Sequence, residues 1–198
     1  MERGVLIRYT KKQPMPLGVG GFTLLEMMIA MAIAAILMTI AVPGFQNVIR
    51  NNRISAASGD LVAALLTAKA ESAGRTNFVT VCKRNSGGSG CEANGGWEQG
   101  WLVFVDEDGD GTVDSGDEIL YDHAALEGGL TAYGTSGITR RVTYRANGMT
   151  NLTSMQTLVL CDQRGYGDNA KGIMVSIIGR ASTSKATDTG AGSCLIPS

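Results

Sequence analysis

The chain has 198 residues, of which 44% are hydrophobic and 18% are charged, and its formal net charge is −1. The apolar content excludes a disordered chain, and the near-zero net charge excludes a bulk attraction to nucleic acid or acidic lipid. His123 is the single histidine, which excludes zinc sites built from several histidines, and the 27 glycines indicate many turns and a β-rich body.

The first feature in chain order is a basic segment followed by a long apolar one. Residues 1–21 carry a net charge of +3, and residues 22–43 contain Glu26 as their only charged side chain. A helix of about 20 apolar residues spans roughly 30 Å, the thickness of a hydrocarbon core, and the basic residues before it predict that residues 1–21 lie in the cytoplasm. A plain membrane anchor is one alternative. A secretory signal peptide is another, although no small-residue cleavage site follows the apolar run promptly.

The start of the apolar run carries a specific motif. Gly20-Gly21-Phe22-Thr23-Leu24-Leu25-Glu26, followed by the apolar residues and Pro43, resembles the class III leader of type IV pilins and pseudopilins. The resemblance implies that a membrane-embedded prepilin peptidase removes residues 1–21 by cutting after Gly21, and that the same enzyme methylates the new amino group of Phe22.

Glu26 is expected to act in assembly. An ionised carboxylate in hydrocarbon costs about 2.5–3.5 kcal/mol, so it needs a partner. The resemblance implies that this partner is the amine of Phe22 on a neighbouring subunit, which would also set the register between adjacent helices. The alternative is a glutamate at the membrane surface that needs no partner.

Helical periodicity continues beyond the apolar run. Apolar residues from Val48 to Ala68 recur at helical spacing, which predicts one long helix over about 23–73 that stops at Gly74. Pro43 predicts a helix break, as a kink or a short melted stretch, between a transmembrane half (22–43) and an amphipathic half (44–74).

Residues 75–198 change to short β-type runs separated by turns rich in glycine and asparagine. The strands are expected at 78–82, 101–105, 118–121, 141–145, 157–161 and 173–178. The whole pattern predicts an α+β fold, in which the long N-terminal helix packs on one face of an antiparallel β-sheet.

The four cysteines all follow the apolar segment, on the side that the charge pattern places outside the cytoplasm. That compartment is oxidising, so two disulfides are expected rather than a metal site. Three connectivities are possible, of which Cys82–Cys91 and Cys161–Cys194 need only local or C-terminal closure.

An acidic block follows the second expected strand. Residues 106–127 contain nine acidic and no basic side chains. Asp106, Asp108 and Asp110 occupy positions 1, 3 and 5 of a calcium-loop pattern, with a glycine at position 6 and Asp117 at position 12. Calcium is therefore a candidate cofactor. A solvated hairpin turn without an ion is the alternative, because strands flank the loop and position 12 lacks the usual glutamate.

Further runs are similar to one branch of the pilin class. The runs at 45–53, 61–65, 70–72, 80–82, 100–106 and 176–180 resemble the GspH/FimT family of minor subunits. The resemblance implies a structural protein, not an enzyme, that helps to initiate or cap a type IV pilus. Its head would lie in the periplasm and its anchor in the bacterial inner membrane, with other pilins and an assembly platform as partners. A minor pseudopilin of a type II secretion system is the alternative.

A second hypothesis concerns DNA. Gly179-Arg180 matches a C-terminal motif through which some FimT-like members bind DNA, but Ala181 and Ser182 follow where another basic residue is expected. Lys185, together with Arg164 and Lys171, could add positive charge for phosphate contacts. The alternative is that Arg180 ends a strand and pairs with the acidic hairpin.

Overall fold

The structure is a computed structural model that describes residues 21–194. The chain divides into two compact units, one ending at Gly44 and the other beginning at Phe45. We refer to residues 21–44 as the N-terminal unit and to residues 45–194 as the C-terminal unit. The helix α1 (Leu24–Arg75) contributes to both units.

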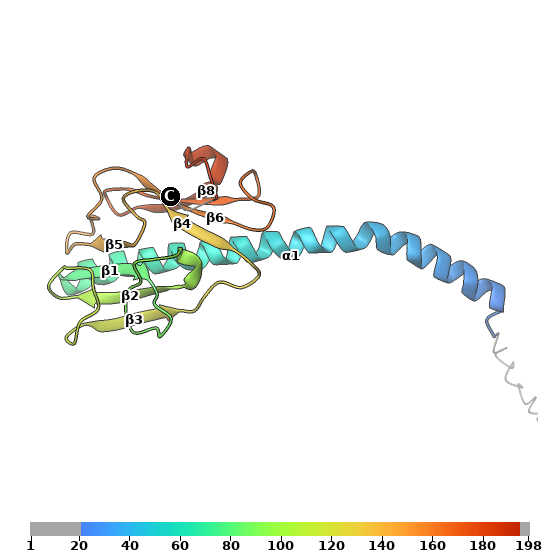
Figure 1. The fold of residues 1–198 in the computed structure, drawn as a ribbon, viewed down its shortest axis with the longest axis horizontal. Coiled ribbons are helices and arrows are strands. Elements are labelled where there is room, and N and C mark those ends of the chain that lie inside the picture. The colour runs from blue at the N-terminus through green and yellow to red at the C-terminus, as the bar shows by residue number, and fades with distance from the viewer. Residues whose placement is uncertain (1–20, 195–198) are drawn as a thin grey trace, which may run out of the picture. The chain divides into compact units, whose positions relative to one another are not determined.

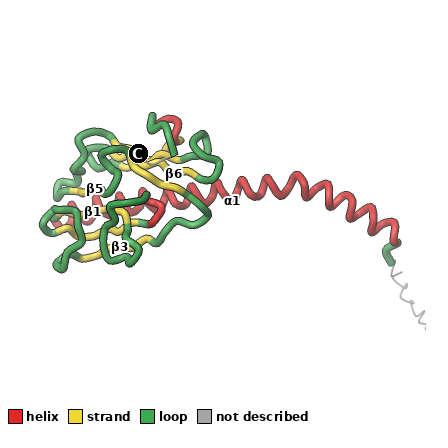
Figure 2. The backbone as a smooth tube through the Cα atoms, in the orientation of Figure 1, coloured by secondary structure: helices red, strands yellow, loops and turns green. Residues whose placement is uncertain are grey.

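The melted stretch predicted as one form of the helix break at Pro43 is wrong, and a kink at Pro43 stays a prediction. The backbone is helical on both sides of Pro43 and through it, and Figure 2 shows α1 as one uninterrupted helix. A proline removes one backbone donor, but its φ of about −65° is compatible with a helix, so the turns before and after it can persist. The expected helix bounds of about 23–73 lie within two residues of the observed ones.

The C-terminal unit contains two four-stranded sheets in which every pairing is antiparallel. The first sheet has the order β3-β2-β1-β5, with β1 (Phe78–Lys83), β2 (Trp101–Asp106), β3 (Glu118–His123) and β5 (Arg141–Tyr144). The second sheet has the order β4-β6-β7-β8, with β4 (Thr131–Gly134), β6 (Gln156–Cys161), β7 (Lys171–Val175) and β8 (Ala181–Lys185). Of two short 3-10 helices, η1 (Trp97–Gln99) lies in the β1–β2 connection and η2 (Ala186–Thr189) follows β8.

The α+β class is confirmed, but the expected single sheet is two sheets, and two strands were missed. Both missed strands, β4 and β8, are the edges of the second sheet. Their sequences, TAYG and ASTSK, are short or polar and lack the apolar alternation that marks a half-buried strand. The last expected strand was too long, because residues 176–179 form the turn between β7 and β8.

One apolar core joins α1 to both sheets. The buried residues of α1 recur at spacings of three and four and include Ile54, Leu61 and Leu65. They pack in one cluster with Val81 and Val103 of the first sheet and with residues such as Leu158 of the second sheet. Figure 1 shows this part of α1 running along both sheets. Burial of each large side chain contributes about 1.5–3 kcal/mol to stability, so the apolar stripe determines which face of α1 packs on the sheets.

The opposite face of the first sheet is covered by loops. Leu102 and Phe104 alternate with the core-facing residues of β2 and pack with Cys82 in a separate cluster. Cys91 and Val113, from the two long loops that follow β1 and β2, cover this cluster. Asp106, at the end of β2, is fully buried under the second of these loops.

Two disulfides hold the loops and the tail. Cys82–Cys91, the first disulfide, closes the loop after β1, and Cys161–Cys194, the second disulfide, joins the C-terminal tail to β6. Their Cα–Cα separations are 5.6 and 6.0 Å, within the usual range. These two pairs are the ones that need only local or C-terminal closure, as expected from the sequence.

Candidate functional site

The start of α1 has a defined cap. The side-chain oxygen of Thr23 accepts a hydrogen bond from the backbone N–H of Glu26, with a distance of 3.2 Å between the two atoms. Thr23 is therefore the N-cap residue and Glu26 stands at N3, the spacing of a capping box. Thr23 was not among the residues singled out from the sequence, although Thr-x-x-Glu before an apolar run is the recognised signature of a capping box.

The apolar side chains of the N-terminal unit have no covering. Phe22, Leu24 and Leu25 are 74, 78 and 68% exposed, and no residue of the most apolar 18-residue stretch of α1 is buried. By length and composition, α1 could cross a membrane. Leaving side chains of this size in water forfeits about 1.5–3 kcal/mol each, so lipid or neighbouring helices must cover them.

The carboxylate of Glu26 makes no hydrogen bond or ion pair with any residue among those described, 21–194. Gly21 and Phe22, the residues on either side of the expected cleavage point, precede the helix and are exposed. The rest of the expected leader, residues 1–20, lies outside the described residues. The N-terminal unit thus presents an apolar helix with one acid that has no partner in the described part of its own chain.

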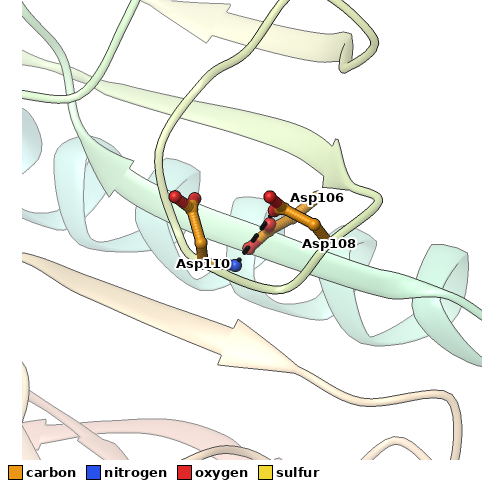
Figure 3. A group of neighbouring side chains, drawn as sticks. All are labelled: Asp106, Asp108 and Asp110. Atoms are coloured by element: carbon orange, nitrogen blue, oxygen red, sulfur yellow. Dashed lines mark hydrogen bonds between the residues drawn. The ribbon is translucent and has the colours of Figure 1, made fainter.

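A second candidate site lies at the end of β2 and in the acidic loop of residues 107–117, which connects β2 to β3. Asp106, Asp108 and Asp110 each place a carboxylate oxygen within 4.8 Å of the other two, and Figure 3 shows the three groups pointing toward one another. Gly109 and Gly111 have φ values of +75°, a conformation that side chains with a Cβ rarely adopt, and they allow the loop to fold back over Asp106. Hydrogen bonds from the hydroxyl and the backbone N–H of Thr112 lower the pKa of Asp110.

Three of the four predicted calcium ligands come together, and the fourth does not. Asp117 is outside the three-carboxylate group, and its two oxygens accept the backbone N–H groups of Glu107 at 3.2 Å and Asp114 at 2.9 Å. Asp117 therefore fastens the ends of the loop together. Desolvation, followed by the negative charge of Asp110, raises the pKa of Asp114 in the same loop.

The basic residues of the DNA hypothesis do not form one cluster of free charges. Lys185 lies 3.7 Å from Asp168, and Arg164 donates several hydrogen bonds to Asp162. Arg180 is exposed after the β7–β8 turn, and its guanidinium makes no hydrogen bond or ion pair within residues 21–194. The alternative pairing of Arg180 with the acidic hairpin is therefore not observed. Arg141 lies at the hairpin instead and donates to the carbonyl of Gly111 at 3.2 Å.

The glycine of the Gly-Arg motif has a structural explanation. Gly179 adopts φ +74°, and a Cβ built at this position would lie 2.2 Å from the carbonyl oxygen of Gly148. Lys69 of α1 donates to the neighbouring carbonyl of Ile178 at 2.9 Å. The turn thus requires glycine because of its backbone conformation and close packing, whatever Arg180 binds.

The single histidine lines an open groove of about 500 Å³ between α1 and β3. The ring of His123 stacks on Trp101 with 3.9 Å between centroids, and its Nε2 lies 3.7 Å from Asp60. Its Nδ1 lies 2.7 Å from the carbonyl oxygen of Ala124. Packing and backbone contacts therefore occupy this ring.

Comparison with known proteins adds a family and a fold. A family model described as "Type II transport protein GspH" matches residues 57–179, and one described as "Prokaryotic N-terminal methylation motif" matches residues 18–42. No curated protein matches the chain at a significant level.

Two solved structures of the type IV minor pilin FimU of Pseudomonas aeruginosa are similar in fold. The crystal form in space group P21 is 21% identical with a TM-score of 0.57, and the match covers 73% of this chain and 96% of that one. The form in space group P65 is 22% identical with a TM-score of 0.52, and the match covers 71% and 99%.

Proposed function

The chain belongs to the GspH family of pilin-like proteins and has a structural role in pilus or pseudopilus assembly; from this premise we propose that it is a minor pilin that helps to initiate or cap a type IV pilus. The observation that supports the proposal is the N-terminal unit. Its apolar helix is exposed throughout, and its only acid, Glu26, has no partner among the described residues.

Cleavage after Gly21 would supply that partner. The new amino group of Phe22 would carry a positive charge at the N-terminus of a helix, where the helix dipole disfavours it. The Glu26 carboxylate of an adjacent subunit would attract this amino group, which offsets the unfavourable helix dipole and the cost of burying the carboxylate in hydrocarbon. The ion pair would also fix the axial register of the two neighbouring helices. The apolar side chains around Glu26 would then be covered first by lipid and later by other pilin helices.

We place the protein in the bacterial inner membrane before assembly, with the C-terminal unit in the periplasm. Two observations support this orientation: the basic residues before the apolar run, and the two disulfides, which persist in an oxidising compartment. The partners in this proposal are the prepilin peptidase, the inner-membrane assembly platform, and the other minor and major pilins.

The decisive test separates the charge of Glu26 from its place in the helix cap. Glu26→Gln keeps the size of the side chain and removes the charge, whereas Thr23→Val removes the capping oxygen and keeps the carboxylate. Both variants are produced in cells with active peptidase, and the fraction of the protein in sheared filaments is measured by immunoblot.

We expect E26Q to be processed and inserted in the membrane but lost from filaments, while T23V enters filaments. Incorporation of E26Q at the wild-type level would contradict the charge-pairing mechanism. Intact mass of the wild-type protein should give a chain that begins at a methylated Phe22, and a product that retains residues 1–21 would refute processing.

A minor pseudopilin of a type II secretion system is the second candidate, and the description of the matching family favours it. Deletion of the gene distinguishes the two: loss of surface pili supports the pilus role, and loss of protein secretion with intact pili supports the pseudopilus role. DNA binding is a third proposal, supported by the exposed and unpaired side chain of Arg180.

A further inference from the structure

We propose that the C-terminal unit carries a calcium site at the β2–β3 connection, with Asp106, Asp108 and Asp110 as carboxylate ligands. The proposal goes beyond a role in filament assembly and does not depend on it. It is based on two separate observations: a buried carboxyl group with one oxygen that has no hydrogen-bond donor, and two further carboxylates that each bring an oxygen within 4.8 Å of that group.

The buried group is Asp106. Its side chain is fully buried, and its Oδ2 accepts hydrogen bonds from the hydroxyl of Thr80 at 2.7 Å and from the backbone N–H of Gly111 at 3.0 Å. The second of these donors belongs to the acidic loop, so the carboxyl group is aimed into that loop. Its other oxygen, Oδ1, is buried and accepts no hydrogen bond within residues 21–194. Because a buried anionic oxygen without a donor is costly, this atom indicates a missing ligand.

The surrounding groups make that ligand a cation. Asp108 and Asp110 bring their oxygens within 4.8 Å of Asp106, so three carboxylates repel one another at one point (Figure 3). Arg141 is close, but its hydrogen bond goes to the carbonyl of Gly111, and none of the three carboxylates forms a salt bridge within residues 21–194. A divalent cation bound by oxygen atoms would remove both the repulsion and the unsatisfied oxygen.

The donor set favours calcium over magnesium. Calcium accepts six to eight oxygen ligands in a flexible geometry that mixes carboxylates, backbone carbonyls and water, whereas magnesium demands a near-ideal octahedron. Asp106, Asp108 and Asp110 occupy the first, third and fifth positions of the calcium-loop spacing, and Gly111 adopts a positive φ at the sixth. The helices that flank such loops elsewhere are replaced here by β2 and β3, and Thr80 of the neighbouring strand β1 holds the Asp106 carboxylate in place through its hydroxyl.

Binding would fix the loop against the first sheet. Val113, in the same loop, packs over Leu102 and Phe104 on the sheet's outer face, and Asp117 closes the loop from its far end. A cation held between Asp106 on the strand and Asp108 and Asp110 on the loop would join these two elements. The stability of the C-terminal unit should therefore depend on calcium.

The test uses the full chain in non-ionic detergent, stripped with chelator and titrated with CaCl₂ by calorimetry, with MgCl₂ as the competing ion. Thermal unfolding is followed in parallel. Asp108→Asn removes one exposed ligand without disturbing the buried Asp106, and Glu107→Gln is the matched control, since it removes the same charge from the adjacent position outside the three-carboxylate group.

We expect one saturable calcium site per chain, and a rise in melting temperature of roughly 5 °C or more at calcium a hundred times the dissociation constant. Asp108→Asn should weaken calcium binding at least about tenfold, and Glu107→Gln should leave it within about threefold. Two results would overturn the proposal. No binding heat and no thermal shift at millimolar calcium would mean that water and Arg141 satisfy the turn. Equal losses in the two variants would mean diffuse attraction to an acidic surface.

Discussion

Replacement of Gly179 by alanine tests whether the Gly-Arg turn is structural. The φ of Gly179 is +74°, and a left-handed conformation costs an alanine roughly 1–2 kcal/mol. The new Cβ would also lie 2.2 Å from the carbonyl oxygen of Gly148, so the turn of residues 145–148 would have to move. That turn is held by a hydrogen bond of 2.7 Å from the N–H of Gly148 to the carbonyl of Arg145. Overpacking of this kind costs about 1–3 kcal/mol, so the total loss is roughly 2–5 kcal/mol.

Gly165 provides the matched control. It also ends a turn with a positive φ, +80°, but nothing lies within 4 Å of a Cβ built there. Gly165→Ala should therefore lose only the conformational part, roughly 1–2 kcal/mol. The difference between the two variants measures the contact with Gly148.

The assay is urea unfolding of the full chain in detergent, followed by tryptophan fluorescence. Both tryptophans of the protein, Trp97 and Trp101, are fully buried in the C-terminal unit, so the signal reports that unit alone. Gly179→Ala should lower the urea midpoint more than Gly165→Ala, with the same denaturant slope. An equal fall of the urea midpoint in the two variants would mean that the contact with Gly148 does not require glycine at position 179. The glycine would then need a functional explanation.

Three other predictions concern the C-terminal unit. Removing the second disulfide with Cys161→Ser and Cys194→Ser should lower the free energy of unfolding of the unit by roughly 4 kcal/mol. The first disulfide should contribute less, roughly 3 kcal/mol, because it closes a shorter loop. Chemical unfolding of the protein with and without each cysteine pair measures both losses. The hydrogen-bonded guanidinium of Arg164 lowers the pKa of Asp162, so the stability from this pair is present above the ordinary pKa of 3.8 and is lost as the pH falls through the lowered value. Asp162→Asn should thus lower the free energy of unfolding at neutral pH and make that free energy fall less steeply as the pH is lowered below 3.8. If the variant loses stability with acid as steeply as the wild type, the pair with Arg164 is not the source of the pH dependence. In gel shifts at low salt, Arg180→Gln should abolish any DNA complex without changing the urea midpoint, and a complex that survives this change would exclude Arg180 as the contact.

Several of the sequence-based expectations depend on local pattern, and these agree with the structure. The helix, with its buried stripe from Ile54 to Ala68, follows from apolar residues spaced three and four apart. The strong strands, such as Thr157–Cys161 within β6, follow from β-branched and apolar runs between turn residues. The melted stretch predicted at Pro43 is the exception, because a proline inside a long helix removes one hydrogen bond and leaves the neighbouring turns in place.

Among the candidate sites, too, those built from adjacent residues could be recognised from the sequence and those that depend on the folded chain could not. The motif around Phe22 and Glu26 could be recognised because all its residues are adjacent in the chain. Asp117 could not be placed, because its oxygens can either reach an ion or cap the backbone amides of Glu107 and Asp114, and only the folded loop chooses between these.

The amino-acid sequence therefore determined by itself the apolar helix with its single acid, the α+β class and the acidic loop, since each depends on residues close together along the chain. Only the tertiary structure decided the division into two sheets, the burial of Asp106 beneath the loop, and the contact that requires glycine at position 179. The physical reason is that burial and steric contact depend on segments far apart in sequence, and no local pattern records which of them will meet.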